Sequence, residues 1–163
     1  MKQQYKIELR KIDYNNLWKI TKLHVTKEQE EFVATNTESI LQAYVAVSSD
    51  RYALPFGIYA DDELVGFVMF GYGKDEEDDP EVAVGNYCIW RFMTDVDHQH
   101  KGYGRAAIPV CLDYLRTMPV GPAQKCWLDC EPENVAAKTL YESFGFHANG
   151  EMCDEAIVME RDL

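Results

Sequence analysis

The sequence has few of the features that mark membrane, secreted or nucleic-acid-binding proteins. No apolar run approaches the roughly 20 residues that a membrane helix needs, and residues 1–6 lack the apolar core of a signal peptide. Only 16 Lys and Arg residues stand against 28 Asp and Glu residues, a net charge of −12. Such a surface would repel a nucleic-acid backbone or an anionic membrane, so we expect a cytoplasmic protein with neither kind of partner.

Signs of a disulfide or metal framework are also missing. The chain has five cysteines, Cys88, Cys111, Cys126, Cys130 and Cys153. They are odd in number and form no Cys-x-x-Cys pair, so we expect reduced, mostly buried thiols. His98 and His100 flank Gln99, but no third ligand lies at metal spacing. This pattern favours solvated loop histidines, and no metal site is predicted.

What is present is typical of one globular domain. The 163 residues and the 47% hydrophobic content suffice for a substantial core, and we expect a single domain over residues 1–163. The acidity has two interpretations. It would attract a cationic substrate, or it serves solubility alone.

The hydrophobic spacing predicts an α+β fold. Strands are expected at residues 7–12, 55–60, 63–71, 82–94, 125–131 and 156–160, and helices at residues 14–24, 37–47, 102–118 and 134–144. The second half requires a right-handed crossover and a parallel pair, whereas the first half adds antiparallel strands. The result is a mixed sheet of about six or seven strands flanked by about four helices.

Two details of this pattern are tested by the structure. The second helix is expected to turn inward the side chains of Ile40, Leu41, Tyr44, Val45 and Val47. Residues 73–81 are rich in acids and hold no apolar residue to bury. They are interpreted as a solvated hairpin loop, with a cation site as the alternative.

The most informative segment covers residues 88–107, a buried strand followed by the turn Gln99-x-x-Gly102-x-Gly104 and a helix. Its glycines let the main chain approach a ligand, and the helix start presents unpaired N–H groups and a positive dipole end. The turn is neither a Walker loop nor a dinucleotide fingerprint, because Gly-Lys-Ser/Thr is absent and the glycine spacing differs. We predict an anion site built from Gln99, His100, Lys101, Gly102, Gly104 and Arg105.

This turn resembles the acetyl-CoA loop of the GNAT (general N-acetyltransferase) superfamily, Gln/Arg-x-x-Gly-x-Gly/Ala. Residues 134–146 are similar to the Asn-x-x-Ala-x-x-Leu-Tyr-x-x-x-Gly-Phe helix that closes the CoA site in that superfamily. The resemblance covers nearly the whole chain, and residues 28–36 and 88–107 look closest to bacterial spermine/spermidine (diamine) acetyltransferases. It implies a GNAT-like sheet with splayed parallel central strands, acetyl-CoA as co-substrate, and a possible homodimer.

The resemblance also implies roles for individual residues. Phe92 and Thr94 would lend main-chain groups to the pantetheine arm, and the Met93 amide would donate to the developing oxyanion. A phenol has a pKa of about 10 and a thiol about 8.5, so Tyr141 can keep its proton at neutral pH and give it to a forming thiolate. Asn134 lies two helical turns away, about 10 Å along the axis on the same face, where it would contact the CoA arm.

The catalytic base is less clear from the sequence. Related polyamine acetyltransferases carry a Glu-Asp pair on the fourth strand, where this chain has Trp90 and Arg91. The remaining candidates for base and acceptor binding are Glu28, Glu30 and Glu31 in the first half, and Asp129 and Glu131 on the fifth strand. Alternation places Trp127, Asp129 and Glu131 on one face. The alternative for Glu131 is that it only opens the loop before Asn134.

The predicted function is acetyl transfer from acetyl-CoA to a primary amine by direct attack, with a polyamine such as spermidine or spermine as acceptor. The same chemistry would serve a protein N-terminus, a lysine or an aminoglycoside. A non-catalytic acyl-CoA sensor is the alternative from another class.

Overall fold

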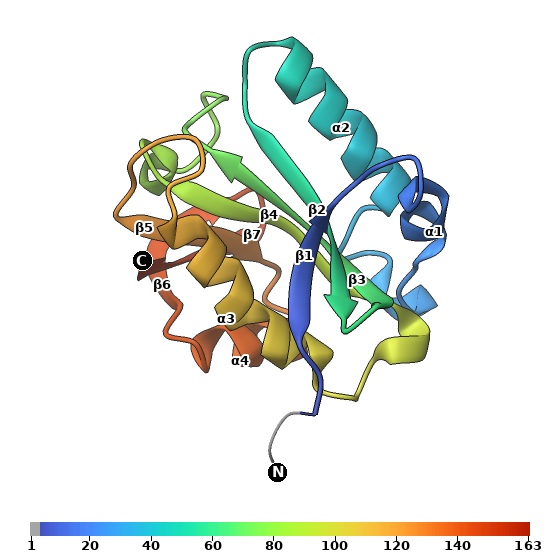
Figure 1. Ribbon diagram of the computed structural model, residues 1–163. Coiled ribbons are helices and arrows are strands. Elements are labelled where there is room, and N and C mark those ends of the chain that lie inside the picture. Colours follow the sequence, from blue (N-terminus) through green and yellow to red (C-terminus); the bar gives the residue numbers. More distant parts are fainter. Residues whose placement is uncertain (1–3) are drawn as a thin grey trace.

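One mixed sheet organises the molecule (Figure 1). The computed structural model describes residues 4–163, so the first three residues of the amino-terminal segment discussed above lie outside it. The seven strands are β1 (Ile7–Lys11), β2 (Ala53–Ala60), β3 (Glu63–Tyr72), β4 (Tyr87–Thr94), β5 (Lys125–Cys130), β6 (His147–Cys153) and β7 (Ala156–Asp162). Their order is β1-β2-β3-β4-β5-β7-β6. Only β4 and β5 pair in parallel, which confirms the predicted α+β class.

The helices and short turns complete the chain. The helices are α1 (Leu17–Lys22), α2 (Asn36–Ser48), α3 (Tyr103–Arg116) and α4 (Val135–Glu142), with the 3-10 turns η1 (Lys27–Gln29), η2 (Glu81–Ala83) and η3 (Val96–His98). No helix in the described part of the chain is long and apolar enough to cross a membrane.

The predicted elements differ from the observed ones where the burial pattern is weak. Strand β6 was not predicted, because none of its side chains is buried and its sequence, HANGEMC, shows no alternation of apolar and polar residues. The strand expected from residue 82 begins at Tyr87, since η2 occupies the preceding residues. Strand β5 ends at Cys130, so Glu131 lies beyond it and not on the strand.

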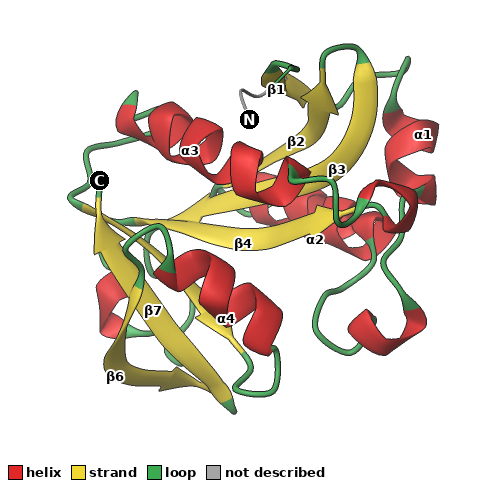
Figure 2. Ribbon diagram, turned by 90° about the horizontal axis from the view of Figure 1, so that it is seen from below, coloured by secondary structure: helices red, strands yellow, loops and turns green. Residues whose placement is uncertain are grey.

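The two faces of the sheet carry separate cores. α3 and α4 cover one face, where Ile108 and Leu115 pack against β-strand residues such as Phe70 and Leu128. α1 and α2 cover the other, where Ile20 and Ala43 pack with Phe67, Met69 and Met93. In Figure 2, α3 and α4 lie toward the left of the view, and α1 and α2 lie toward the right.

Of the five side chains of α2 that were expected to face inward, Ile40 packs against the core, whereas Leu41, Tyr44, Val45 and Val47 are exposed. The buried side chains of α2 are small or polar: Asn36, Ser39, Ala43 and Ala46. By contrast Leu41, Tyr44 and Val45 are 62%, 73% and 59% exposed. The prediction failed for these side chains because hydrophobicity alone does not say which of two helix faces meets the sheet, and the small side chains permit close approach.

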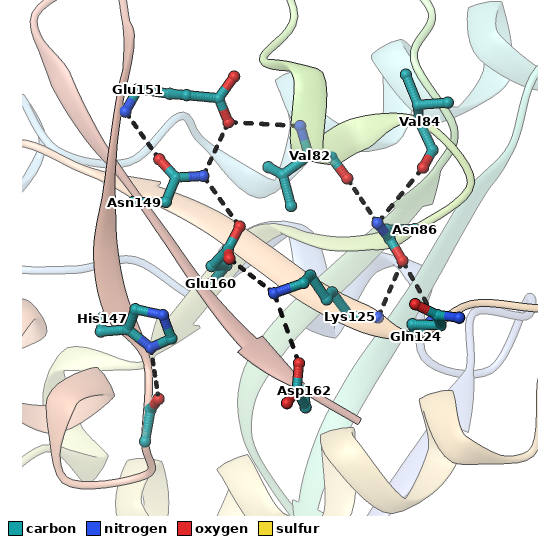
Figure 3. A network of polar contacts seen from close by, with 11 residues as sticks. Val82, Val84, Asn86, Gln124, Lys125, His147, Asn149, Glu151, Glu160 and Asp162 are labelled. Atoms are coloured by element: carbon teal, nitrogen blue, oxygen red, sulfur yellow. Dashed lines mark hydrogen bonds and ion pairs between the residues drawn. The ribbon is translucent and has the colours of Figure 1, made fainter.

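The parallel strands are joined only at one end. Tyr87 pairs with Cys126 and Cys88 with Trp127, and no further pair follows. Asn86 fixes this junction (Figure 3), because its Oδ1 accepts from the main-chain N–H groups of Gln124 (3.1 Å) and Lys125 (2.9 Å). Beyond it the strands diverge and leave a V-shaped opening in the sheet.

Lys125 and Glu160 extend the same network toward β6. Lys125 Nζ lies 2.8 Å from Glu160 Oε1 on the neighbouring strand β7, and Asn149 of β6 donates to Glu160 Oε2 at 3.0 Å (Figure 3). The closed end of the V is therefore tied to the edge of the sheet.

Candidate active site

Strand β4 changes phase at a β-bulge, and this determines where its side chains lie. Met69 of β3 pairs with Arg91 and Phe70 with Ile89, so Trp90 is the extra residue. Phe92 and Thr94 then lie on the α3 face. The side chain of Arg91 lies on the other face, where its guanidinium reaches Gln42 of α2.

The turn before α3 has the geometry of an anion cradle. Gly102, the N-cap of α3, has φ +86°, and His100 has φ +62°. Within the described chain, no hydrogen bond is made by the main-chain N–H groups from His100 to Arg105. These donors, together with the dipole of α3, suit a phosphate.

The side chain of Gln99 stabilises the same turn. Its Nε2 donates to the Thr94 carbonyl (3.1 Å) and to Gln29 Oε1 of η1 (2.8 Å). Gly104 sits where a Cβ would stand 3.4 Å from Thr94 Oγ1 and 3.8 Å from the Phe92 ring. A Cβ at this position would already be in van der Waals contact, so the turn lies directly against the end of β4.

A cleft of about 980 Å³ begins at this turn and follows the open V. It is lined on one side by Phe92, Met93, Thr94, Gln99, His100, Gly102, Gly104 and Arg105, and on the other by Asp129, Glu131, Asn134 and Tyr141. The first-half loop adds Glu30 and Glu31, whereas Glu28 and Lys101 do not line the cleft. The cleft therefore connects the free amides of the turn with the open end of the V.

Tyr141 lies at the buried side of the cleft. It is 9% exposed, and its ring meets Phe146 edge-on with 5.9 Å between centroids. Burial raises the pKa of the phenol, so the group stays protonated across the neutral range. Asn134 uses its Oδ1 to cap α4 at Ala137 N–H (3.4 Å).

A second cavity of about 620 Å³ opens on the α2 face of the sheet. Its charged lining consists of Glu38, Arg51, Asp75, Glu76, Asp79, Arg91 and Asp129. Three of these acids, Asp75, Glu76 and Asp79, come from the 73–81 segment. Asp75 and Glu76 are exposed, as expected of a solvated loop. Arg51 ion-pairs with Glu76, and Asp79 accepts from the amides of Asp75 and Glu76, which keeps the loop beside the cavity.

The two cavities meet at four residues that line both: Ile89, Trp90, Arg91 and Asp129. Asp129 keeps solvent access inside the cleft, yet the protein around it raises the pKa of its carboxyl by burial, while Arg91 lowers it. Burial likewise lowers the pKa of Arg91, and Asp129 and Glu38 raise it. The junction therefore holds one acid and one cation.

His98 is ion-paired and half-buried, which corrects its interpretation as a solvated loop residue. Its ring lies 3.0 Å from Asp95 Oδ2 and 2.9 Å from Glu63 Oε1. Burial alone would lower the pKa of His98, but the hydrogen bonds to Glu63 and Asp95 outweigh it and raise the pKa. No group of three metal-ligating side chains occurs among residues 4–163.

Sequence reasoning missed Asn86, Gln42 and the acids of the 73–81 segment as parts of this site. Asn86 has no motif, because its role is to accept from two amides of another strand. The acids carried a signal in their density, and the Pro80 that follows them suggested only a loop.

Comparisons with known proteins agree with this geometry. A family model described as the Acetyltransferase (GNAT) family matches residues 14–146. The spermine/spermidine N(1)-acetyltransferase of Bacillus subtilis (strain 168) is 27% identical over 148 residues, which covers 90% of this chain and 91% of the relative.

Solved structures share the fold at lower identity. An aminoglycoside acetyltransferase in complex with coenzyme A gives a TM-score of 0.76 at 17% identity, over 96% of this chain and 95% of that chain. The PaiA N-acetyltransferase from Thermoplasma acidophilum, in complex with coenzyme A, gives 0.64 at 17% identity, over 97% and 99%.

Proposed function

Because the chain belongs to the acetyltransferase (GNAT) family and is an acetyl-CoA-dependent N-acetyltransferase, we propose that its acceptor is a polyamine of the spermidine or spermine type. The observation that carries this proposal is the second cavity, which meets the acetyl-CoA cleft at the β4 bulge. Its wall holds five carboxylates against two guanidinium groups, one of which, Arg51, is already paired with Glu76.

The cavity wall suits a chain of methylene groups that carries positive charges. Apolar surface comes from Leu41, Val45, Tyr52, Trp90 and Trp127, and acids lie at both the junction and the far loop. Burial raises the pKa of Asp75, so a bound ammonium would lower the free energy of its ionised form. The relative from Bacillus subtilis is named for the same class of acceptor.

The residues of the cleft have distinct tasks in this reaction. Acetyl-CoA supplies the activated acetyl group. The amides from His100 to Arg105 bind its phosphates, and the main chain of Phe92 and Thr94 orients its arm. The Met93 amide donates to the carbonyl oxygen as negative charge develops there. Tyr141 protonates the departing sulfur.

Glu31 and Glu131 line the acetyl-CoA cleft and not the second cavity. We therefore assign them to the entrance of the cleft and assign contact with the acceptor to Asp129 and the acids of the 73–81 segment. Glu28 lies on η1, outside both cavities.

We propose that the homodimer forms through the part of α2 that lies outside the second cavity. The exposed side chains of Tyr44 and Val47, with Trp18 of α1, are neutral in a chain of net charge −12, so two copies would meet there with little repulsion. Sedimentation should give about twice 18.8 kDa, and a Tyr44→Glu variant that remains dimeric would refute this placement.

The acceptor is tested with spermidine and hexylamine, a monoamine with a neutral tail. Spermidine should have the higher kcat/KM, and Asp75→Asn should raise its KM roughly fivefold, as expected for a partly exposed ion pair of about 1 kcal/mol. The matched control is Asp78→Asn, an acid of the same loop that does not line the cavity. Equal kcat/KM values for the two amines would refute the polyamine assignment.

A further inference from the structure

Arg91 is a partly buried cation with no ion pair among the described residues. Its Nη1 donates to the Trp90 carbonyl and its Nη2 to Gln42 Oε1, each at 3.0 Å. Both acceptors are neutral. Its Nε is buried and has no hydrogen-bond partner in the described chain. A buried charge without a counter-ion is costly, so its position at the junction of two cavities calls for a functional explanation.

Arg91 lies where the acceptor nitrogen would pass from the second cavity to the acetyl-CoA cleft. Residues that line both cavities border the path from the second cavity to the acetyl-CoA cleft. Arg91 and Asp129 are the charged residues among these four, and each shifts the pKa of the other. Both charges therefore act on a group that passes through the junction.

We propose that Arg91 and Asp129 jointly deprotonate the acceptor: Asp129 relays the proton from the amine to solvent, and the charge of Arg91 keeps Asp129 ionised and disfavours the ammonium form of the amine. The proposal rests on the proposed function, since it assumes an amine acceptor. Arg91 is a positioning residue in this scheme, and Asp129 is the proton relay.

The protons balance as follows. The ammonium group of the acceptor transfers one proton to Asp129, which releases it to solvent before the acetyl transfer. The freed lone pair then forms the carbon–nitrogen bond while the carbon–sulfur bond breaks, and Tyr141 gives its proton to the sulfur. The nitrogen releases a second proton, which restores Tyr141.

The size of the effect follows from Coulomb's law. A like charge about 7 Å away, at an effective dielectric constant of about 20, lowers the pKa of an ammonium by between one and two units. Salt and water in the open cavity reduce this to roughly one unit. A primary amine with a pKa of about 10.4 would then be about tenfold richer in its neutral form at pH 7.

The first test needs no substrate. The Asp129 carboxyl is titrated by ¹³C NMR in the wild type, in Arg91→Gln and in Arg51→Gln, with Asp129→Asn to assign the signal. Arg91→Gln should raise the pKa of Asp129 by roughly one unit. Arg51→Gln, which removes the other arginine of the same cavity, should leave it unchanged. An unchanged pKa of Asp129 in Arg91→Gln would overturn the proposal.

The second test uses the pH profile of kcat at saturating acceptor, which reports ionisations in the substrate complex. In Arg91→Gln the acidic limb should move to higher pH by roughly one unit, so that kcat falls about tenfold at pH 7 and recovers at high pH. Arg91→Lys should keep the wild-type limb. A loss that is equal at every pH would assign Arg91 a structural role and overturn the proposal.

Spermidine is used first, and the best amine of a panel replaces it if spermidine is not acetylated. Failure of the polyamine assignment then appears as a change of substrate, whereas failure of this inference appears as an unshifted limb or an unshifted Asp129 titration.

Discussion

Asn86 should stabilise both the protein and its acetyl-CoA cleft, although it touches neither cavity. Its Oδ1 accepts from the amides of Gln124 and Lys125, and its Nδ2 donates to the Val82 carbonyl at 2.8 Å. Asn86→Ala removes these three bonds, together with the longer one from Nδ2 to the Val84 carbonyl (3.4 Å). At about 1 kcal/mol for each, reduced because solvent reaches part of the network, the free energy of unfolding should fall by about 2 kcal/mol.

Asn86→Asp is the matched control. A carboxylate can still accept from Gln124 N–H and Lys125 N–H but cannot donate to Val82, so the loss should be about 1 kcal/mol or less. Urea unfolding followed by circular dichroism measures both values, and an unchanged m-value confirms that the comparison is valid.

The effect of Asn86→Ala on acetyl-CoA binding distinguishes the proposed role of Asn86 from a general loss of stability. The two bonds hold the closed end of the V, so Asn86→Ala should weaken acetyl-CoA binding several-fold at a temperature where the variant is fully folded. Calorimetry measures this affinity. A loss of less than about 0.5 kcal/mol in stability, or an unchanged affinity in the folded alanine variant, would refute the view that Asn86 fixes the opening between β4 and β5.

Three further outcomes follow from the site. Gly104→Glu should abolish acetyl-CoA binding in a folded protein, because a Cβ there already stands 3.4 Å from Thr94 Oγ1 and the carboxylate repels phosphate. Calorimetry measures the acetyl-CoA affinity of the variant. Tyr141→Phe should lower kcat by about 10²- to 10⁴-fold and leave the acetyl-CoA affinity nearly unchanged, and a variant that keeps half of kcat would make Tyr141 a packing residue. The pKa of His98 is higher in the folded protein than in the unfolded chain. The stabilisation of the folded protein by the charged imidazole is therefore complete below the unfolded pKa of about 6.5, and it is lost as the pH rises through the folded pKa. His98→Gln should therefore cost about 1 kcal/mol at pH 5.5 and less at pH 9, and an equal cost at both would contradict the ion pairs.

Local pattern was sufficient for the parts of the fold that depend on neighbouring residues. The Gln99 to Gly104 turn and the 134–146 motif carry their geometry in the sequence, because glycine conformation and helix phase are local properties. Strand β6 and the inward face of α2 were not predictable in the same way. Both depend on contacts with other parts of the sheet, and the sequence of a single strand or helix does not contain that information.

The candidate site shows the same division. The acetyl-CoA cleft follows from two contiguous motifs, so its residues could be named from sequence. The second cavity combines α2, the 73–81 segment, β4 and β5, which are far apart in the chain. Its acids were visible as a charged run, but only the ion pair of Arg51 with Glu76 and the turn around Asp79 show that the run borders the cavity.

A single extra residue in β4 determines which face of the sheet Arg91 occupies. In an unbroken strand that keeps Trp90, the residues Tyr87, Ile89 and Arg91 would share one face, and Arg91 would point into the apolar core beneath α3. The bulge at Trp90 shifts the phase, so that Phe92 and Thr94 return to the α3 face while Arg91 reaches Gln42 on the opposite side. Deleting Trp90 would place Arg91 directly after Ile89 and therefore still on the face opposite Ile89. Arg91 should then keep its influence on the Asp129 titration in that variant, and loss of this influence would contradict the assignment of the bulge to Trp90.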